Sequence, residues 1–151
     1  MTDRNPLIPE LPGAQAILVV DDAPVVRRLT YRLLAEAGYR VFEAASATEA
    51  LEVLGMARGQ VKLVLIDVVL PDVGGVDLAR LVRDAAPDAG VVFMSAFPAE
   101  VLVRQGLRDP RVPFIAKPFT REELLTVAAE ALASRAPGGD PAHRITGQGG
   151  T

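Results

Sequence analysis

Five polar residues of this sequence directly follow apolar runs, and their chemical types could act together. They are two adjacent aspartates, a third aspartate, a serine and a lysine: Asp21, Asp22, Asp67, Ser95 and Lys117. Three carboxylates brought together repel one another, which raises the pKa of at least one of them. Mg²⁺ relieves this repulsion, because a hard cation prefers carboxylate oxygens and retained water. One carboxylate can then stay ionised as a nucleophile toward phosphorus and form an aspartyl phosphate.

Strand-like and helix-like segments alternate along the chain, and they must bring these residues together. Apolar runs predict strands over residues 16–20, 40–45, 61–66, 90–94 and 113–116. Five short strands alternating with helices predict a single α/β domain, a doubly wound parallel sheet with helices on both faces. Ligands of such sheets bind at the carboxyl ends of the strands, and all five polar residues are expected at that edge.

Helical spacing and capping residues predict the intervening helices. A helix begins at about Pro24, and its apolar residues are Val26, Leu29, Leu33, Leu34 and Ala37. Capping boxes at 46–49 and 120–123 open two others. The helix after Gly75 is expected to be buried through Leu78, Leu81, Val82 and Ala85. Residues 98–106 form a poor helical pattern, so the fourth helix is predicted to be short or irregular.

Composition excludes several classes of protein. Half of the 151 residues are hydrophobic and 23% are charged, as in a globular chain. The net charge is −3 and the basic residues are dispersed, which argues against direct nucleic-acid binding. Cysteine is absent, so disulfides and thiolate metal sites are excluded. The most apolar stretch is too short to cross a bilayer, and we expect a soluble, cytoplasmic protein without membrane insertion.

The two ends differ in composition from the middle of the chain. Residues 1–13 contain three prolines and are predicted to be an extended lead-in to a domain over residues 14–134. Residues 135–151 are rich in Gly, Pro and polar residues, which predicts a disordered tail. The lone His143 lies in this tail and is interpreted as a solvated residue.

Four motifs together resemble the receiver domains of two-component response regulators. They are ILVVDD at 17–22, LID at 65–67 followed by Leu70-Pro71 and Gly74-Gly75, FMSA at 93–96, and AKPF at 116–119. The resemblance covers residues 14–134 and implies a flavodoxin-like strand order of 2-1-3-4-5. It further implies a signalling module rather than an enzyme, which assists its own phosphorylation and slow dephosphorylation.

The resemblance also assigns roles to individual residues. Asp67 is expected to accept the phosphoryl group, while Asp21, Asp22, Asp67 and the backbone carbonyl of Val69 hold Mg²⁺. Lys117 and the Ser95 hydroxyl are expected to contact the phosphoryl oxygens. Ser95 and Phe114 fill the positions that couple phosphorylation to the face formed by the last two strands and their helices. The Lys117–Pro118 bond is expected to be cis.

The residues near the acceptor predict a long-lived phosphoryl group. Val69 and Phe97 lie where the family controls access of hydrolytic water, and neither can orient a water by a hydrogen bond. The expected partners are a histidine kinase or a histidine phosphotransfer protein and a downstream protein target. The motifs around the fourth helix and Lys117 look more like the receivers of hybrid histidine kinases than those of transcription factors.

Other interpretations of the same residues remain open at this stage. A Mg²⁺-dependent hydrolase of the haloacid-dehalogenase type would also use an aspartate nucleophile, but it needs an aspartate where Val69 stands. A flavin-binding module would find its phosphate repelled by Asp21 and Asp22. Those two aspartates could instead cap the helix at Pro24. Arg27 and Arg28 are interpreted as a solvated face, with partner docking as the alternative.

Overall fold

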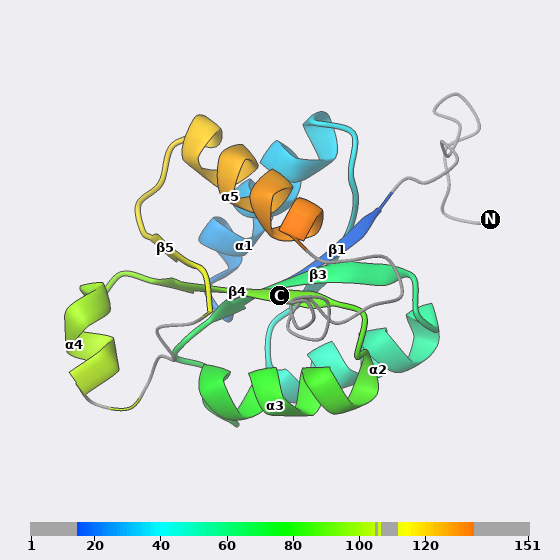
Figure 1. Ribbon diagram of the computed structural model, residues 1–151, viewed down its shortest axis with the longest axis horizontal. Coiled ribbons are helices and arrows are strands. Elements are labelled where there is room, and N and C mark those ends of the chain that lie inside the picture. Colours follow the sequence, from blue (N-terminus) through cyan, green and yellow to red (C-terminus); the bar gives the residue numbers. More distant parts are fainter. Residues whose placement is uncertain (1–14, 105, 107–111, 135–151) are drawn as a thin grey trace, which may run out of the picture.

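The computed structural model describes residues 15–104, 106 and 112–134, and these form one parallel sheet covered by helices on both faces (Figure 1). The strands are β1 (Ala16–Val20), β2 (Arg40–Ala44), β3 (Val61–Asp67), β4 (Gly90–Ser95) and β5 (Phe114–Ala116). They lie in the order β2-β1-β3-β4-β5, with every neighbouring pair parallel. The predicted fold class and strand order are confirmed. The expected lead-in, tail and His143 lie outside the described residues.

Within the described residues, four helices connect the strands and a fifth follows β5. Helices α1 (Pro24–Glu36) and α5 (Arg121–Ser134) cover one face, while α2 (Ala47–Ala57) and α3 (Gly75–Ala85) cover the other (Figure 1). Helix α4 (Ala99–Arg104) is short and lies beside the β4–β5 edge (Figure 1). A short fourth helix was predicted, because apolar residues at 98–106 do not sustain a helical pattern.

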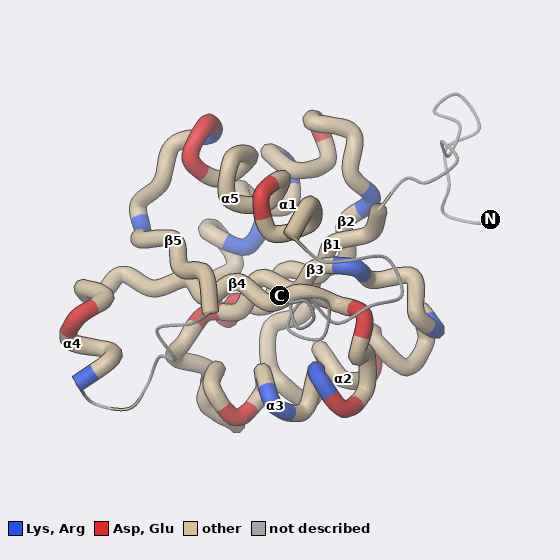
Figure 2. Tube along the Cα trace, in the orientation of Figure 1, with Lys and Arg blue, Asp and Glu red and all other residues tan. Residues whose placement is uncertain are grey.

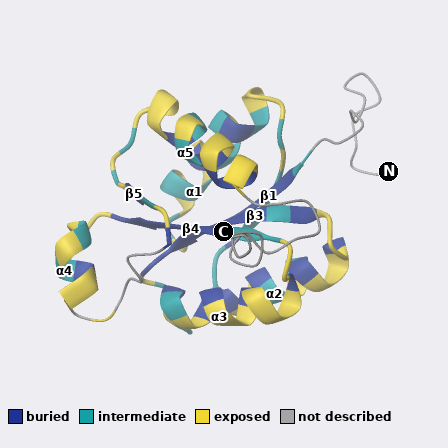
Figure 3. Ribbon diagram, in the orientation of Figure 1, coloured by how far each residue is buried: buried dark blue, intermediate teal, exposed yellow. Residues whose placement is uncertain are grey.

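Apolar side chains fill both spaces between the sheet and the helices. Residues of β1 alternate between the two cores: Leu18 and Val20 pack with α2 and α3, while Ile17 and Val19 pack with α1 and α5. The strands β1, β3 and β4 are buried along almost their whole length, the edge strands β2 and β5 are only partly buried, and the outer faces of the helices are exposed (Figure 3). A strand covered on both faces must be apolar at successive positions, which is why β1 and β3 could be recognised in the sequence.

The capping boxes form as predicted, with one difference. Thr120 Oγ1 accepts from the Glu123 amide at 3.0 Å, and Glu123 Oε1 accepts from the Thr120 amide at 2.9 Å. Ser46 Oγ accepts from the Glu49 amide at 3.2 Å, but the Glu49 carboxylate reaches the amide of Ala45 instead of that of Ser46. These bonds satisfy amides that have no partner inside the helix.

The predicted buried face of α3 is partly wrong. Leu78 and Val82 are fully buried, as expected, but Leu81 is 40% exposed and Ala85 is also exposed. The helix instead packs through the small residue Ala79, which brings it close to the sheet and leaves a narrow apolar stripe inside. In α1, Leu29 is likewise 45% exposed although it has helical spacing.

Candidate functional site

Two neighbouring strands place the buried aspartates side by side. Val20 of β1 pairs with Ile66 of β3, so the next residues along the chain, Asp21 and Asp67, emerge together at the carboxyl edge of the sheet. Asp21 is fully buried and Asp67 is 8% exposed, whereas Asp22 is exposed. The predicted meeting of the three aspartates at one edge is therefore present in the structure.

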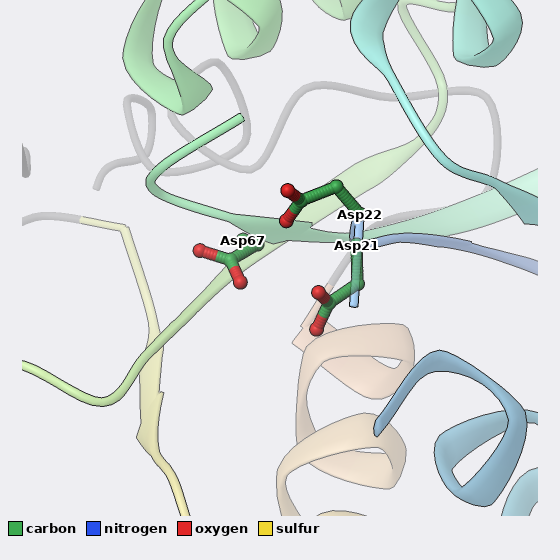
Figure 4. A group of neighbouring side chains, drawn as sticks. All are labelled: Asp21, Asp22 and Asp67. Atoms are coloured by element: carbon green, nitrogen blue, oxygen red, sulfur yellow. The ribbon is translucent and has the colours of Figure 1, made fainter. Parts of the chain in front are cut away.

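The three carboxyl groups converge on one small space (Figure 4). One oxygen from each of Asp21, Asp22 and Asp67 lies within 4.8 Å of the others. This is a group of hard oxygen donors that comes from two strand ends, with its exposed member open to solvent. Such a donor set suits a divalent cation with several retained waters, which is the coordination that Mg²⁺ requires.

Lys117 joins two of these carboxylates from the end of β5, two strands away from β3 in the sheet. Its Nζ lies 2.6 Å from Asp21 Oδ2 and 2.6 Å from Asp67 Oδ2, and its side chain is 14% exposed. The end of β5 brings it there, because the Lys117 amide donates to the Ser95 carbonyl at 2.9 Å. The Lys117–Pro118 bond is cis, as expected.

The environment shifts the pKa of both members of the Asp67–Lys117 pair. Burial raises the pKa of Asp67 and outweighs the hydrogen bonds from Lys117 and the Val69 amide, which act to lower it. For Lys117, burial acts to lower the pKa, but the hydrogen bonds to Asp21 and Asp67 outweigh it and raise the pKa above 10.5. Lys117 is therefore an ammonium at neutral pH, beside the carboxylate at the end of β3.

Ser95 ends β4 next to this cluster and is 1% exposed. Its hydroxyl accepts a hydrogen bond from the Phe97 amide at 3.0 Å, which leaves its own hydrogen as a donor. Similarly, the Val69 amide donates to Asp67 Oδ1 at 2.9 Å. Val69 and Phe97, the two apolar residues whose amides make these bonds, are 51% and 54% exposed.

Helix capping does not explain the aspartate pair. The residue at the start of α1 is Ala23, which makes no side-chain capping bond. Asp21 Oδ1 accepts from the amide of Ala23 itself at 2.9 Å, so this carboxylate shapes the turn before the helix. Neither Asp21 nor Asp22 is therefore the N-cap of α1.

Two residues near the site, Arg27 and Asp72, make contacts that the sequence did not predict. Arg27 was interpreted as solvated, but its side chain is 20% exposed and bonds to Glu43 and to the Asp21 carbonyl. Asp72, after β3, accepts from the amides of Ala47 and Thr48 at 3.0 Å each and so caps α2 from a distant loop. The contacts of Asp72 with α2 and of Arg27 with Glu43 join residues that lie 16 to 25 positions apart, and the bond from Arg27 to the Asp21 carbonyl depends on how α1 packs beside β1, so no local sequence spacing predicts them.

Gly75 allows close packing between the start of α3 and the end of β3. A Cβ at this position would lie 2.8 Å from the Asp67 carbonyl oxygen and 2.8 Å from Val68 Cα. The Gly75 amide donates to the Val68 carbonyl at 2.8 Å. The absence of a side chain therefore lets α3 start directly against the end of β3, where Asp67 stands.

Comparison with a protein-family model identifies the family of this chain. The model of the response regulator receiver domain matches residues 17–129. This chain belongs to the response regulator receiver domain family. The match contains both strand ends that carry the aspartates, and Ser95 and Lys117 as well.

Individual relatives agree with this assignment. The chain is 37% identical over 123 residues to the sensor kinase CckA of Brucella abortus, an alignment that covers 82% of this chain and 13% of CckA. A crystal structure of the receiver domain from hybrid histidine kinase CckA has 31% identity and a TM-score of 0.66, and covers 78% of this chain and 98% of that one. A response regulator receiver protein from Sinorhizobium medicae has 26% identity and a TM-score of 0.71, covering 82% and 98%. The chain thus spans a small part of the CckA sequence.

Two general observations concern the surface. Lys and Arg are interspersed with Asp and Glu over the described residues and do not gather on one element (Figure 2). Among the helices of the described part of the chain, none is long and apolar enough to cross a bilayer.

Proposed function

We propose that this receiver takes a phosphoryl group from a histidine kinase or a histidine phosphotransfer protein onto Asp67. The observation that carries the proposal is the arrangement around this carboxylate. Asp67 lies with Asp21 and Asp22 on one side and has the Lys117 ammonium at 2.6 Å. Phosphoryl transfer depends on such positioning and charge neutralisation rather than on covalent chemistry by many groups.

In the transfer step a carboxylate oxygen of Asp67 attacks the phosphorus of a phosphohistidine. The new P–O bond forms as the P–N bond breaks, and the bonding electron pair returns to the imidazole nitrogen. Lys117 is placed to offset negative charge on the phosphoryl oxygens, and its raised pKa keeps it protonated throughout. The Ser95 hydroxyl has a hydrogen to donate to one of those oxygens.

The donor set fits a bound Mg²⁺ held by Asp21, Asp22, Asp67 and the Val69 backbone carbonyl. Carboxylate oxygens suit this hard cation, and the exposed Asp22 leaves the site open to water and to a partner. When bound, Mg²⁺ would neutralise charge on the carboxylates and on the incoming phosphoryl oxygens. Asp21, which is fully buried, would hold its side of the site in place.

The response to phosphorylation is assigned to Ser95 and Phe114. A Ser95 hydroxyl drawn toward a phosphoryl oxygen gives up its bond with the Phe97 amide, which frees the β4–α4 loop. Phe114 is partly buried and lines a groove with Pro118 and Val127, where a ring has room for a second position. The face near β4, β5 and their helices would thereby change its shape for a downstream protein.

The apolar residues beside Asp67 support a long phosphoryl lifetime. Hydrolysis needs a water aligned behind phosphorus, and the exposed side chains of Val69 and Phe97 offer no hydrogen bond for it. We expect a lifetime of minutes to hours. A timed radiolabel chase without partner measures it, and loss of the label within seconds would contradict the expectation.

The likeness to CckA favours a chain that works in a phosphorelay with a hybrid histidine kinase, through protein contacts. A haloacid-dehalogenase type of hydrolase gains no support, since the residue two positions after Asp67 is the apolar Val69. The downstream target would be a protein, and localisation in the cytoplasm follows from the kinase as donor.

Beryllofluoride, which mimics a phosphoryl group on a carboxylate, tests the acceptor directly. Two-dimensional NMR spectra should shift on adding beryllofluoride with Mg²⁺, foremost at the amides near Asp67, Ser95 and Lys117. Asp67→Asn should abolish the response, because the amide cannot form the bond. Asp77→Asn is the matched control, since Asp77 is an exposed aspartate on α3 that pairs with Arg80. A full response of Asp67→Asn would move the acceptor elsewhere.

A further inference from the structure

Arg27 makes a contact that the phosphoryl chemistry described above leaves unused. From the first turns of α1 it reaches back to the main chain of Asp21, where Nη1 donates to the carbonyl oxygen at 2.9 Å. Its Nε donates to Glu43 Oε1 at 3.0 Å. The guanidinium is therefore a bridge between the end of β1 and the end of β2, and its side chain is 20% exposed.

The bridged carbonyl lies at the point where the chain turns from strand to helix. The Asp21 amide donates to the Ala44 carbonyl at 3.0 Å, and its Oδ1 accepts from the Ala23 amide at 2.9 Å. The carbonyl bond from Arg27 completes this set. Because the Asp21 carbonyl belongs to the peptide that leads into Asp22, fixing it also fixes the direction in which the Asp22 carboxylate leaves the backbone.

Glu43 prepares Arg27 for this contact. Its second oxygen, Oε2, accepts from Arg28 Nη1 at 2.9 Å, so one carboxylate serves both arginines. The two arginines differ in their surroundings, since the Arg28 side chain is 65% exposed and its described hydrogen bond goes to Glu43 rather than to the Asp21–Asp22 turn. Because Glu43 already holds the Arg27 guanidinium at Nε, less side-chain conformational entropy is lost when Nη1 donates to the Asp21 carbonyl.

We propose that Arg27 is a positioning residue of the acidic site, which holds the Asp21–Asp22 turn so that both carboxylates face Asp67. The proposal rests on the proposed Mg²⁺ site. Arg27 touches no reacting atom, and it acts through the backbone of Asp21. Partners that orient metal ligands in this way commonly change metal affinity when they are replaced.

The test measures Mg²⁺ binding to the unphosphorylated chain by isothermal titration calorimetry. Arg27→Lys keeps the charge but loses the fork, because one ammonium cannot reproduce both bonds in this geometry. Arg27→Gln removes the charge as well. Arg28→Gln is the matched control, since Arg28 shares Glu43 but does not contact the turn. Urea unfolding without metal reports how far each variant is destabilised.

Both Arg27 variants should raise the Mg²⁺ dissociation constant by about tenfold, and Arg28→Gln should change it by less than about twofold. Protection of the Ala23 amide against hydrogen exchange, measured without metal, should fall in the Arg27 variants alone. A purely structural role would lower stability in all the variants and leave the affinity of the folded protein unchanged.

Two different failures can be told apart. Wild-type affinity in Arg27→Lys, or equal weakening in Arg28→Gln, overturns the positioning role and leaves the proposed Mg²⁺ site intact. A wild type that binds no Mg²⁺ overturns the proposed function, and the positioning role with it.

Discussion

The two sides of the sheet that supply the site are built very differently. β1 and β3 have five and seven residues and are flanked by helices of 11 to 14 residues, whereas β5 has three residues and α4 has six. We call the first part, β1, β2 and β3 with α1, α2 and α3, the anchored side, and β4, α4 and β5 the light side. The aspartates stand on the anchored side, and Ser95, Phe114 and Lys117 on the light side.

Additional ties reinforce the anchored side. Arg27 binds the turn after β1, Asp72 binds the first turn of α2, and Gly75 packs directly on the end of β3. The described contacts at the light side are those of a short pairing, such as Phe93 N–H to Pro113 O at 2.9 Å. The proposed phosphorylation response needs a rigid acceptor and an element that can move at low cost in free energy, and this division is consistent with both.

The largest expected effect comes from shortening one buried leucine on each side and comparing the losses in unfolding free energy. Leu65 in β3 is fully buried, and Leu102 in α4 is 1% exposed. Leu65→Ala should lower the free energy of unfolding by about 3–5 kcal/mol, because the surrounding sheet cannot close the cavity. Leu102→Ala should cost about 2 kcal/mol, since a short helix can settle into the space. Urea unfolding followed by circular dichroism measures both, and equal losses would remove the distinction between the two sides.

A pair of glycine substitutions gives effects of opposite sign within the anchored side. Gly75→Ala should destabilise by about 1–3 kcal/mol, because its methyl group would meet backbone atoms at 2.8 Å that cannot move aside. Gly55→Ala, in the exposed middle of α2, should stabilise by about 0.5–1 kcal/mol, since nothing lies within 4 Å of the new Cβ. Thermal unfolding of both variants measures these changes. An unchanged stability of Gly75→Ala would show that the backbone at the end of β3 can shift to make room for the methyl group.

The smallest effect concerns Asp72 and depends on pH. Hydrogen bonds from the Thr48 and Ala47 amides and the Thr48 hydroxyl hold the pKa of Asp72 well below its usual value of 3.8. A carboxyl with a lowered pKa contributes stability above its unfolded pKa, and loses it as the pH falls through the folded value. Asp72→Asn should therefore lower the urea midpoint at neutral pH, and its difference from wild type should shrink between about pH 4 and pH 2. Asp84→Asn is the control for removal of one surface charge. A pH-independent difference would mean that Asp72 does not tie the loop through its charge.

The strands and the polar residues at their carboxyl ends could be predicted from the sequence for the same reason. In a parallel sheet covered on both faces the interior strands are continuous apolar runs, so the first polar residue marks the carboxyl end. Asp21, Asp67 and Lys117 each stand at such an end, and this placed them on one edge before any distance was known. The buried faces of α1 and α3 were less predictable. Leu29 and Leu81 have helical spacing but lie beside the narrow stripe that meets the sheet.

The sequence by itself determined the fold class, the strand order through its resemblance to receivers, and the residues that meet at the acidic edge. Local patterns suffice for the fold class and for the residues at the acidic edge, because a strand that is buried on both faces must be apolar at successive positions. Only the tertiary structure decided that Arg27 holds the Asp21 carbonyl, that Asp72 caps α2, and that Gly75 must lack a side chain. Each of these is a contact between segments whose approach depends on how helices pack against the sheet, and a linear pattern does not encode that distance.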